Sequence, residues 1–156
     1  MSELPHLDEH GDARMVDVSG KDVSARSARA RGRVVTSPEV VALLRSGELP
    51  KGDALAVARI AGIMAAKRTP DLVPLCHPIA LHSVDVDCMV VDDGVDVEVT
   101  TRTADRTGVE MEALTAVVVA CLAIVDMVKA VDPAATITDV GVVEKIGGKT
   151  GIWTRS

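Results

Sequence analysis

The stretch HSVDVDCMVVDDGVDVEVTTRT, residues 82–103, decides the fold of this chain. Apolar and polar residues alternate through both halves, which predicts two strands that each bury one face. The central DDG, residues 92–94, predicts a tight turn between the strands. The segment therefore predicts a β-hairpin in an antiparallel sheet, with these residues facing inward: Val84, Val86, Cys88 or Met89, Val95, Val97 and Val99.

The opposite face of the hairpin carries four carboxylates: Asp85, Asp87, Asp96 and Glu98. Such a group resembles a metal cluster. A period of two, however, places all four on the solvent face of a half-buried sheet. We favour the solvent face and expect no metal there.

Helical patterns lie on both sides of the hairpin. GDALAVARIAGIMAAKRT, residues 52–69, has apolar residues at helical spacing before Pro70. Thr107 and Glu110 match a capping box, and Pro133 follows, so one long helix is predicted over 108–131. A shorter helix is predicted from Ser37 as N-cap and Pro38 as the first helical residue, stopping at Gly47.

Two further strands are predicted, one within residues 27–37 and one within residues 135–151, before a glycine-rich, basic end. The order strand, two helices, hairpin, long helix, strand predicts an α+β fold in which helices cover one face of an antiparallel sheet. Residues 1–20 are polar and predict an extended or partly disordered arm. Residues 21–156 predict a single α+β domain.

Composition narrows the classes of partner. The 156-residue chain is 47% hydrophobic, carries a formal charge of −6, and contains one Trp and no Phe or Tyr. The acidic balance argues against a nucleic-acid binder, and base stacking on aromatic side chains is largely excluded. Local clusters of Arg and Lys fit an anionic small molecule.

The same sequence predicts a soluble cytoplasmic protein. The most apolar stretch, residues 114–125, is shorter than the roughly 20 residues that span a bilayer. The first 20 residues lack the plan of a signal peptide. The three cysteines form no CxxC pair and are expected to be reduced. We expect no membrane partner.

Three features carry candidate chemistry. Asp126 and Lys129 are neighbours on one helix face, either an acid–base couple or an ordinary ion pair at a helix end. Glu112 precedes Asp126 by 14 residues, about 21 Å on one helix, so either one is incidental or the helix meets another subunit. Cys76 and His77 are adjacent and fit a ligand contact better than a metal site.

Five segments in order resemble the molybdenum cofactor biosynthesis protein C family: MVDVS (15–19), ARIAGIMAAKRTPDLVPLCHPI (58–79), TGVEMEALTA (107–116), DMVKAV (126–131) and KIGGKTG (145–151). The resemblance implies a cyclic pyranopterin monophosphate synthase, a lyase. This enzyme would convert 3′,8-cyclised dihydro-GTP, made by a radical enzyme, to cyclic pyranopterin monophosphate and pyrophosphate. The resemblance also implies a ferredoxin-like fold and a homohexamer, a trimer of dimers, with sites at subunit interfaces.

The resemblance assigns roles residue by residue. Asp126 and Lys129 resemble the catalytic pair, with Lys51 contributed across an interface. The predicted substrate-binding residues are Leu75, Cys76, His77, Met111 and Glu112, with Arg26, Lys67 and Lys145 as triphosphate contacts. No cofactor is required, although Mg²⁺ can accompany the triphosphate. The alternative from another class is a non-catalytic oligomeric binder of nucleotides or pterins, which would not need Asp126.

Overall fold

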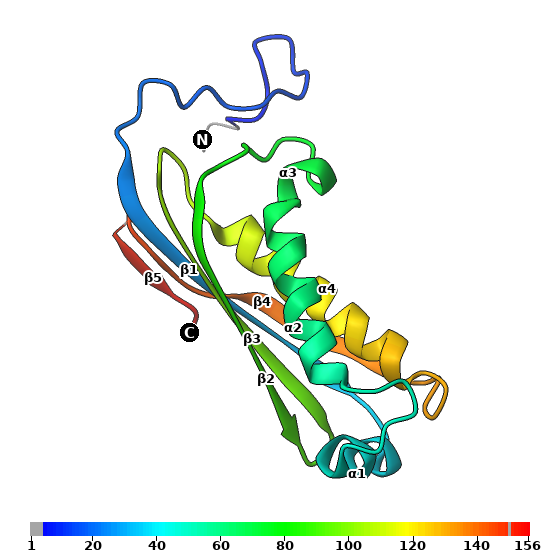
Figure 1. The fold of residues 1–156 in the computed structure, drawn as a ribbon. Helices are drawn as coiled ribbons and strands as arrows, with labels where there is room; N and C mark the ends of the chain where they lie inside the picture. The colour runs from blue at the N-terminus through cyan, green and yellow to red at the C-terminus, as the bar shows by residue number, and fades with distance from the viewer. Residues whose placement is uncertain (1–4, 150) are drawn as a thin grey trace.

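The computed structural model describes residues 5–149 and 151–156 as an antiparallel sheet covered on one face by helices (Figure 1). The strand order is β2-β3-β1-β4-β5. The strands are β1 (Ser24–Val35), β2 (Leu81–Val91), β3 (Gly94–Asp105), β4 (Thr136–Ile146) and β5 (Ile152–Thr154). The helices are α1 (Pro38–Ser46), α2 (Ala54–Lys67), α3 (Thr69–Leu72) and α4 (Glu110–Val128). The predicted α+β class is confirmed.

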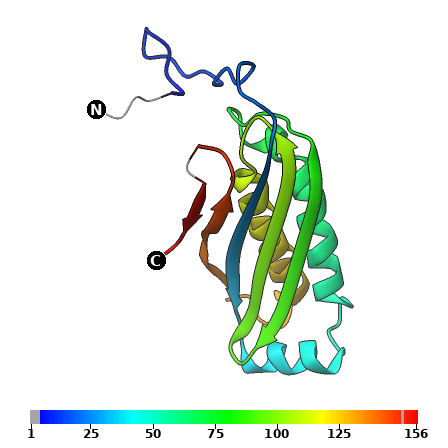
Figure 2. The same cartoon turned by 90° about the vertical axis from the view of Figure 1, so that its left-hand side faces the viewer.

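The order of the elements matches a ferredoxin-like fold. Strands β1 and β2 are joined through α2, and β3 and β4 through α4, with β1 and β3 in the centre of the sheet. This is the split βαβ arrangement, repeated once. Both long helices cover the same face, and the other face is left open (Figure 2).

The hairpin forms as predicted. Val86 pairs with Val99 and Cys88 with Val97, so these side chains share one face of the sheet. Cys88 is partly buried and Met89 is 68% exposed, which settles the choice between them in favour of Cys88. The four carboxylates lie on the opposite face, where Asp85 pairs with Arg102 at 3.0 Å.

Helix α4 begins later than predicted. Its N-cap is Val109, which makes no side-chain cap hydrogen bond, so the capping box expected from Thr107 and Glu110 is wrong. The Glu110 side chain instead reaches Lys145 in the neighbouring strand, with 3.4 Å between Oε1 and Nζ. Glu110 thus forms an ion pair with a lysine of β4 and not the predicted hydrogen bond at the start of its own helix.

Small residues allow α2 and α4 to pack closely. A side chain at Gly62 would meet the main-chain oxygen of Ala116 at 3.1 Å and Ala120 at 3.4 Å. This close approach leaves a thin interior that Ala and Val can fill, which accounts for a core without Phe or Tyr. By length and composition, helix α4 is apolar enough to cross a membrane, but half of its most apolar 18-residue segment is buried in the fold. Its hydrophobicity is accounted for by packing against α2 and the sheet.

Three local features differ from the predictions or extend them. Pro70 lies inside the short helix α3, for which no helix was predicted. Strand β5 was not predicted, and it pairs with β4 through Glu144–Thr154, Lys145–Trp153 and Ile146–Ile152. Residues 5–23 form turns and one isolated bridge, between Leu7 and Ala13.

Candidate active site

The last turn of α4 carries a cluster that we call the aspartate cluster: Lys51, Asp126 and Lys129. Lys129 Nζ lies 2.7 Å from Asp126 Oδ1. Lys51 Nζ donates to the main-chain oxygen of Asp126 at 3.0 Å and lies 3.5 Å from both carboxylate oxygens. Both ammonium groups therefore contact a single carboxylate.

Lys51 reaches Asp126 within one chain. It lies in the loop between α1 and α2, and this loop runs beside the end of α4 because α2 and α4 pack antiparallel (Figure 1). Lys51 and Asp126 thus meet within the single chain, although they are 75 residues apart in sequence. A contribution of Lys51 across a subunit interface stays a prediction.

The aspartate cluster is exposed in the single chain. More than half of the side-chain surface of Asp126 and of Lys129 is open, so apolar walls do not enclose the pair within the described part of the chain. The hydrogen bond and the charge of Lys129, followed by those of Lys51, hold the pKa of Asp126 below its ordinary value. Asp126 is thus an ionised carboxylate at neutral pH, held between two cations.

The first turn of α4 carries the second cluster, which we call the glutamate cluster: Leu75, Cys76, His77, Met111 and Glu112. Glu112 is only 2% exposed, and Cys76 Sγ lies 3.5 Å from its Oε1. Within the part of the chain that the structure describes, Oε2 is buried without a hydrogen-bond partner. Burial raises the pKa of Glu112 above its ordinary value. An unpaired buried acceptor is costly unless a ligand satisfies it.

The segment Leu75–His77 is held by the end of β3. The Ala80 N–H donates to Asp105 Oδ2 at 2.9 Å, and the Thr103 hydroxyl donates to the Ala80 carbonyl. Burial and the neighbouring Glu112 raise the pKa of Cys76 to about 11. Cys76 is thus a neutral thiol, suited to donating a hydrogen bond and unsuited to nucleophilic attack or metal ligation.

The predicted triphosphate contacts lie around the same end of the molecule. Arg26, near the start of β1, donates from Nη2 to the Arg106 main-chain oxygen at 3.5 Å. Lys145 is held by Glu110 of the first turn of α4. Lys67 is exposed at the end of α2 and makes no ion pair among the described residues. The three cations belong to three different elements, β1, β4 and α2.

The Gly147–Gly148 turn packs directly on Arg26. Both glycines have positive φ, +100° and +75°. A side chain at Gly148 would lie 2.6 Å from Arg26 Nη1, and one at Gly147 would lie 2.5 Å from the Ala25 oxygen. These glycines are therefore required both by the backbone conformation and by the space that Arg26 occupies.

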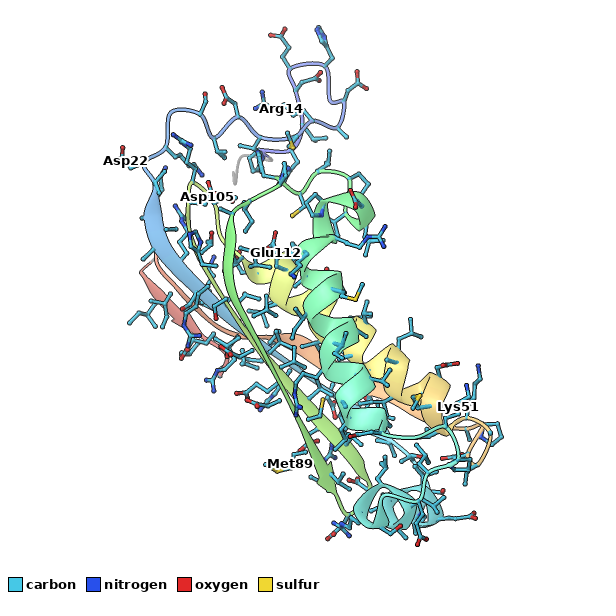
Figure 3. The ribbon with its side chains drawn as sticks, viewed as in Figure 1. Arg14, Asp22, Lys51, Met89, Asp105 and Glu112 are labelled. Atoms are coloured by element: carbon cyan, nitrogen blue, oxygen red, sulfur yellow. The ribbon has the colours of Figure 1, made fainter. Side chains whose placement is uncertain are left out.

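The two clusters lie at opposite ends of α4 (Figure 3, where Glu112 and Lys51 are labelled). Fourteen residues of one helix separate Glu112 from Asp126, about 21 Å along the axis. Both cannot contact one small molecule from the same chain. The separation predicted from the sequence thus follows from the single continuous helix.

The sequence-based reasoning missed two partners. Glu110 was interpreted only as a helix cap, but it forms an ion pair with Lys145. The available signal for a role near the site was its position in the first turn of α4, beside Glu112. Val16 contacts His77 through its main-chain oxygen, for which no side-chain pattern gives a signal.

A groove lies away from both clusters, on the open face of the sheet. It has a volume of about 840 Å³, and Arg31, Arg33, Asp96 and Asp139 are among the residues that line it. Arg33 is already paired with Asp96 at 2.8 Å. Among the described residues, no group of three or more His, Cys, Asp or Glu side chains is arranged to hold a metal ion.

The fold and the two clusters on one helix define a ferredoxin-like α+β protein with polar groups gathered at both ends of its longest helix. The chain belongs to the MoaC family, whose model matches residues 15–148. This confirms the family that the sequence motifs indicated.

Curated relatives match over nearly the whole chain. A protein of Streptomyces coelicolor named cyclic pyranopterin monophosphate synthase is 68% identical, covering 98% of this chain and 90% of its own length. Cyclic pyranopterin monophosphate synthase 2 of Mycobacterium tuberculosis is 59% identical, with 98% and 92% coverage. The Thermomicrobium roseum protein, also named cyclic pyranopterin monophosphate synthase, is 55% identical, with 99% and 95% coverage.

Proposed function

We propose that this chain is a cyclic pyranopterin monophosphate synthase of molybdenum cofactor biosynthesis. Its substrate is (8S)-3′,8-cyclo-7,8-dihydroguanosine 5′-triphosphate, and its products are cyclic pyranopterin monophosphate and pyrophosphate. The observation that carries the proposal is the near-complete coverage by relatives of that name at up to 68% identity. Because an internal hydroxyl displaces pyrophosphate, the reaction belongs with those of the phosphorus–oxygen lyases.

The aspartate cluster supplies acid and base. Asp126 is ionised and accepts protons, while Lys129, 2.7 Å away, is a charged donor. The reaction opens an aminal, closes a pyrazine ring and forms a cyclic phosphate, and each step moves a proton. Lys51 and Lys129 together bring two positive charges to the point where negative charge develops as pyrophosphate leaves.

The glutamate cluster binds the base of the substrate. The free Oε2 of Glu112 is a buried acceptor that suits the N–H groups of a guanine-derived amide and amino edge. Recognition here rests on hydrogen bonds, since the chain has no Phe or Tyr and its single Trp, Trp153, lies in β5. Arg26, Lys67 and Lys145 provide positive charge for the triphosphate.

A complete site requires two chains, because the clusters are about 21 Å apart on one helix. The outer faces of α2 and α4 expose Ile60, Met64 and Leu122 at 55–60%, a surface suited to burial against another copy. The assembly we propose is a homohexamer, a trimer of dimers, in which Glu112 of one subunit and Asp126 of another contact one substrate.

The proposed enzyme needs no cofactor of its own. Mg²⁺ can accompany the triphosphate as part of the substrate. The formal charge of −6 argues against a nucleic-acid partner. We assign the enzyme to the cytoplasm as a soluble protein without a membrane partner, since its apolar helix is accounted for by the core and its relatives carry the names of biosynthetic enzymes.

The direct test is to incubate the purified protein with the cyclised GTP intermediate and to measure pyranopterin and pyrophosphate. Both products should form in equal amounts. Absence of product with a well-folded oligomer would contradict the proposal. Tight binding without turnover would favour a non-catalytic binder of nucleotides or pterins.

A further inference from the structure

The N-terminal arm contacts the candidate site at two points. His77 Nε2 lies in hydrogen-bond contact with the main-chain oxygen of Val16. Arg106 Nε donates to the main-chain oxygen of Lys21 at 3.1 Å, and Arg106 in turn accepts from Arg26. Figure 3 shows the arm, from Arg14 to Asp22, running across the end of the molecule that carries Glu112. The arm is thus tied to His77 directly and to Arg26 through Arg106.

The Val16 contact determines which nitrogen of His77 carries the proton. A main-chain carbonyl oxygen only accepts hydrogen bonds, so the nitrogen that contacts it must donate. A neutral imidazole has one N–H, and the hydrogen bond of one nitrogen sets the state of the other. With the proton on Nε2, Nδ1 keeps its lone pair.

We propose that Val16 is a positioning residue of the site: its main-chain carbonyl holds His77 in the Nε2–H tautomer and leaves Nδ1 as the nitrogen that accepts from the ligand. This inference rests on the proposed function, in which the segment Leu75–His77 binds substrate. It gives the arm a specific chemical task. The task requires no side chain of Val16, only the position of its carbonyl.

The local structure holds both partners in place. On the arm, Asp17 Oδ1 accepts from the Ser19 N–H at 2.9 Å, which fixes a turn directly after Val16. Hydrogen bonds from Ser19 hold the pKa of Asp17 below its ordinary value. On the other side, Ala80 ties the His77 segment to Asp105. Hydrogen bonds thus anchor the chain directly after each of the two partners.

Two N-terminal deletions test the proposal. Removing residues 1–12 leaves Val16 and eliminates His6 and His10, so that only His77 and His82 remain for ¹⁵N nuclear magnetic resonance. Removing residues 1–17 also eliminates the Val16 carbonyl. We expect a fixed Nε2–H tautomer at His77 in the first protein and exchange between tautomers in the second, while His82 is unchanged in both.

Activity supplies the second readout. The longer deletion should raise KM by about tenfold, as expected when an acceptor that binds the substrate loses its orientation, while the shorter one should leave KM within about twofold. An unchanged His77 tautomer after the longer deletion would overturn the proposal, as would an Nδ1–H tautomer in the shorter one. If even the full chain is inactive, the proposed function fails, whereas the tautomer assignment is judged by the spectra alone.

A pair of substitutions covers the case in which the longer deletion disturbs the sheet and shifts His82. Asp17→Ala removes the acceptor that holds the turn after Val16, and Asp17→Asn keeps an acceptor but removes the charge. The Ala variant should release the His77 tautomer and the Asn variant should retain it. A tautomer retained in the Ala variant, or lost in both, would overturn the assignment to the carbonyl.

Discussion

Lys51 Nζ donates to the main-chain oxygen of Asp126 at 3.0 Å within a single chain. Lys129, which follows Asp126 by three residues, donates from Nζ to Asp126 Oδ1 at 2.7 Å. The acid–base half of the proposed site is therefore complete in one chain. The base-binding half, around Glu112, lies at the other end of the same helix.

Asp126→Asn should remove activity and leave the fold intact. The side chain is exposed and of equal volume, so the melting temperature should stay close to that of the parent. The loss of a proton acceptor should lower kcat by about 10²–10⁴-fold. A matched control is Asp85→Asn, which removes an exposed, ion-paired carboxylate from the open face of the sheet and should leave kcat unchanged. A failure of Asp126→Asn to assemble would show that the ion pair is structural.

Lys129→Gln should shift the acidic limb of the pH–rate profile. Lys129 is the main cause of the lowered pKa of Asp126, so its removal raises that pKa toward the ordinary value. Asp126 then loses its charge at a higher pH, and the acidic limb of kcat/KM moves upward. Arg45→Gln, which removes a cation from an exposed pair with Asp92, is the control. If the acidic limb of kcat/KM fell at the same pH in the variant and the parent, Asp126 would not be the group that ionises there.

Glu112→Gln should make the free energy of unfolding less dependent on pH. Burial raises the pKa of Glu112 in the folded chain, so the unfolded chain releases this proton first as the pH rises. The parent therefore loses stability as the pH rises from the ordinary glutamate value through the raised one. The Gln variant carries no such proton and should gain stability relative to the parent as the pH rises.

Urea unfolding of both proteins between about pH 4 and about pH 8 measures this difference. Glu48→Gln, an exposed glutamate in the loop after α1, should follow the parent at every pH. Substrate affinity of the Glu112→Gln variant should fall even where its stability rises, because an amide presents only one acceptor oxygen. A constant difference in stability across the pH range would rule out a raised pKa at Glu112.

Gly148→Ala should weaken substrate binding through Arg26. The added methyl group would lie 2.6 Å from Arg26 Nη1, so the guanidinium must move. Gly47→Ala is a matched control, because Gly47 has nearly the same φ, +74° against +75°, with nothing near the added methyl group. Both should lose about 1–2 kcal/mol of stability from the left-handed backbone, but only the first should raise KM. If the two variants had equal KM values at equal thermal stability, Arg26 would not be part of the binding site.

The sequence was sufficient where structure depends on neighbouring residues. The alternation in residues 82–103 predicts the faces of the hairpin residues except for the choice between Cys88 and Met89, since the register follows from a tight turn. The N-cap Ser37 and the stop at Gly47 follow from local backbone chemistry in the same way. The start of α4 was predicted wrongly because the capping box is also local, and here Lys145 of β4 competes for Glu110.

The features of the site that depend on tertiary contacts could not be predicted. Lys51 meets Asp126 only because α2 packs antiparallel to α4, and the sequence of neither helix alone predicts that packing. The exposed surroundings of Asp126 and the burial of Glu112 also depend on what covers each end of the helix. The family motifs indicated the candidate residues, and the fold then distributed them between two clusters.

Mixing two inactive variants should restore activity if each site is built from two chains. In a mixed oligomer, an Asp126→Asn subunit still supplies Glu112, and a Glu112→Gln subunit still supplies Asp126. With equal amounts and random assembly, about a quarter of the sites combine both intact clusters, so about a quarter of the parental activity should return. Co-expression with two different tags, followed by tandem purification, provides the mixed oligomers for the assay.

The matched control for this mixing experiment is the pair Asp126→Asn and Lys129→Gln. Both residues belong to the aspartate cluster, which one chain completes by itself, so no mixture of these variants contains an intact cluster. The activity of that mixture should lie between those of its two variants and should not exceed that of Lys129→Gln. Recovery in the control would mean that Asp126 and Lys129 act from separate chains. Failure of the Glu112 mixture, in oligomers shown to contain both variants, would mean that the two ends of α4 do not share a substrate.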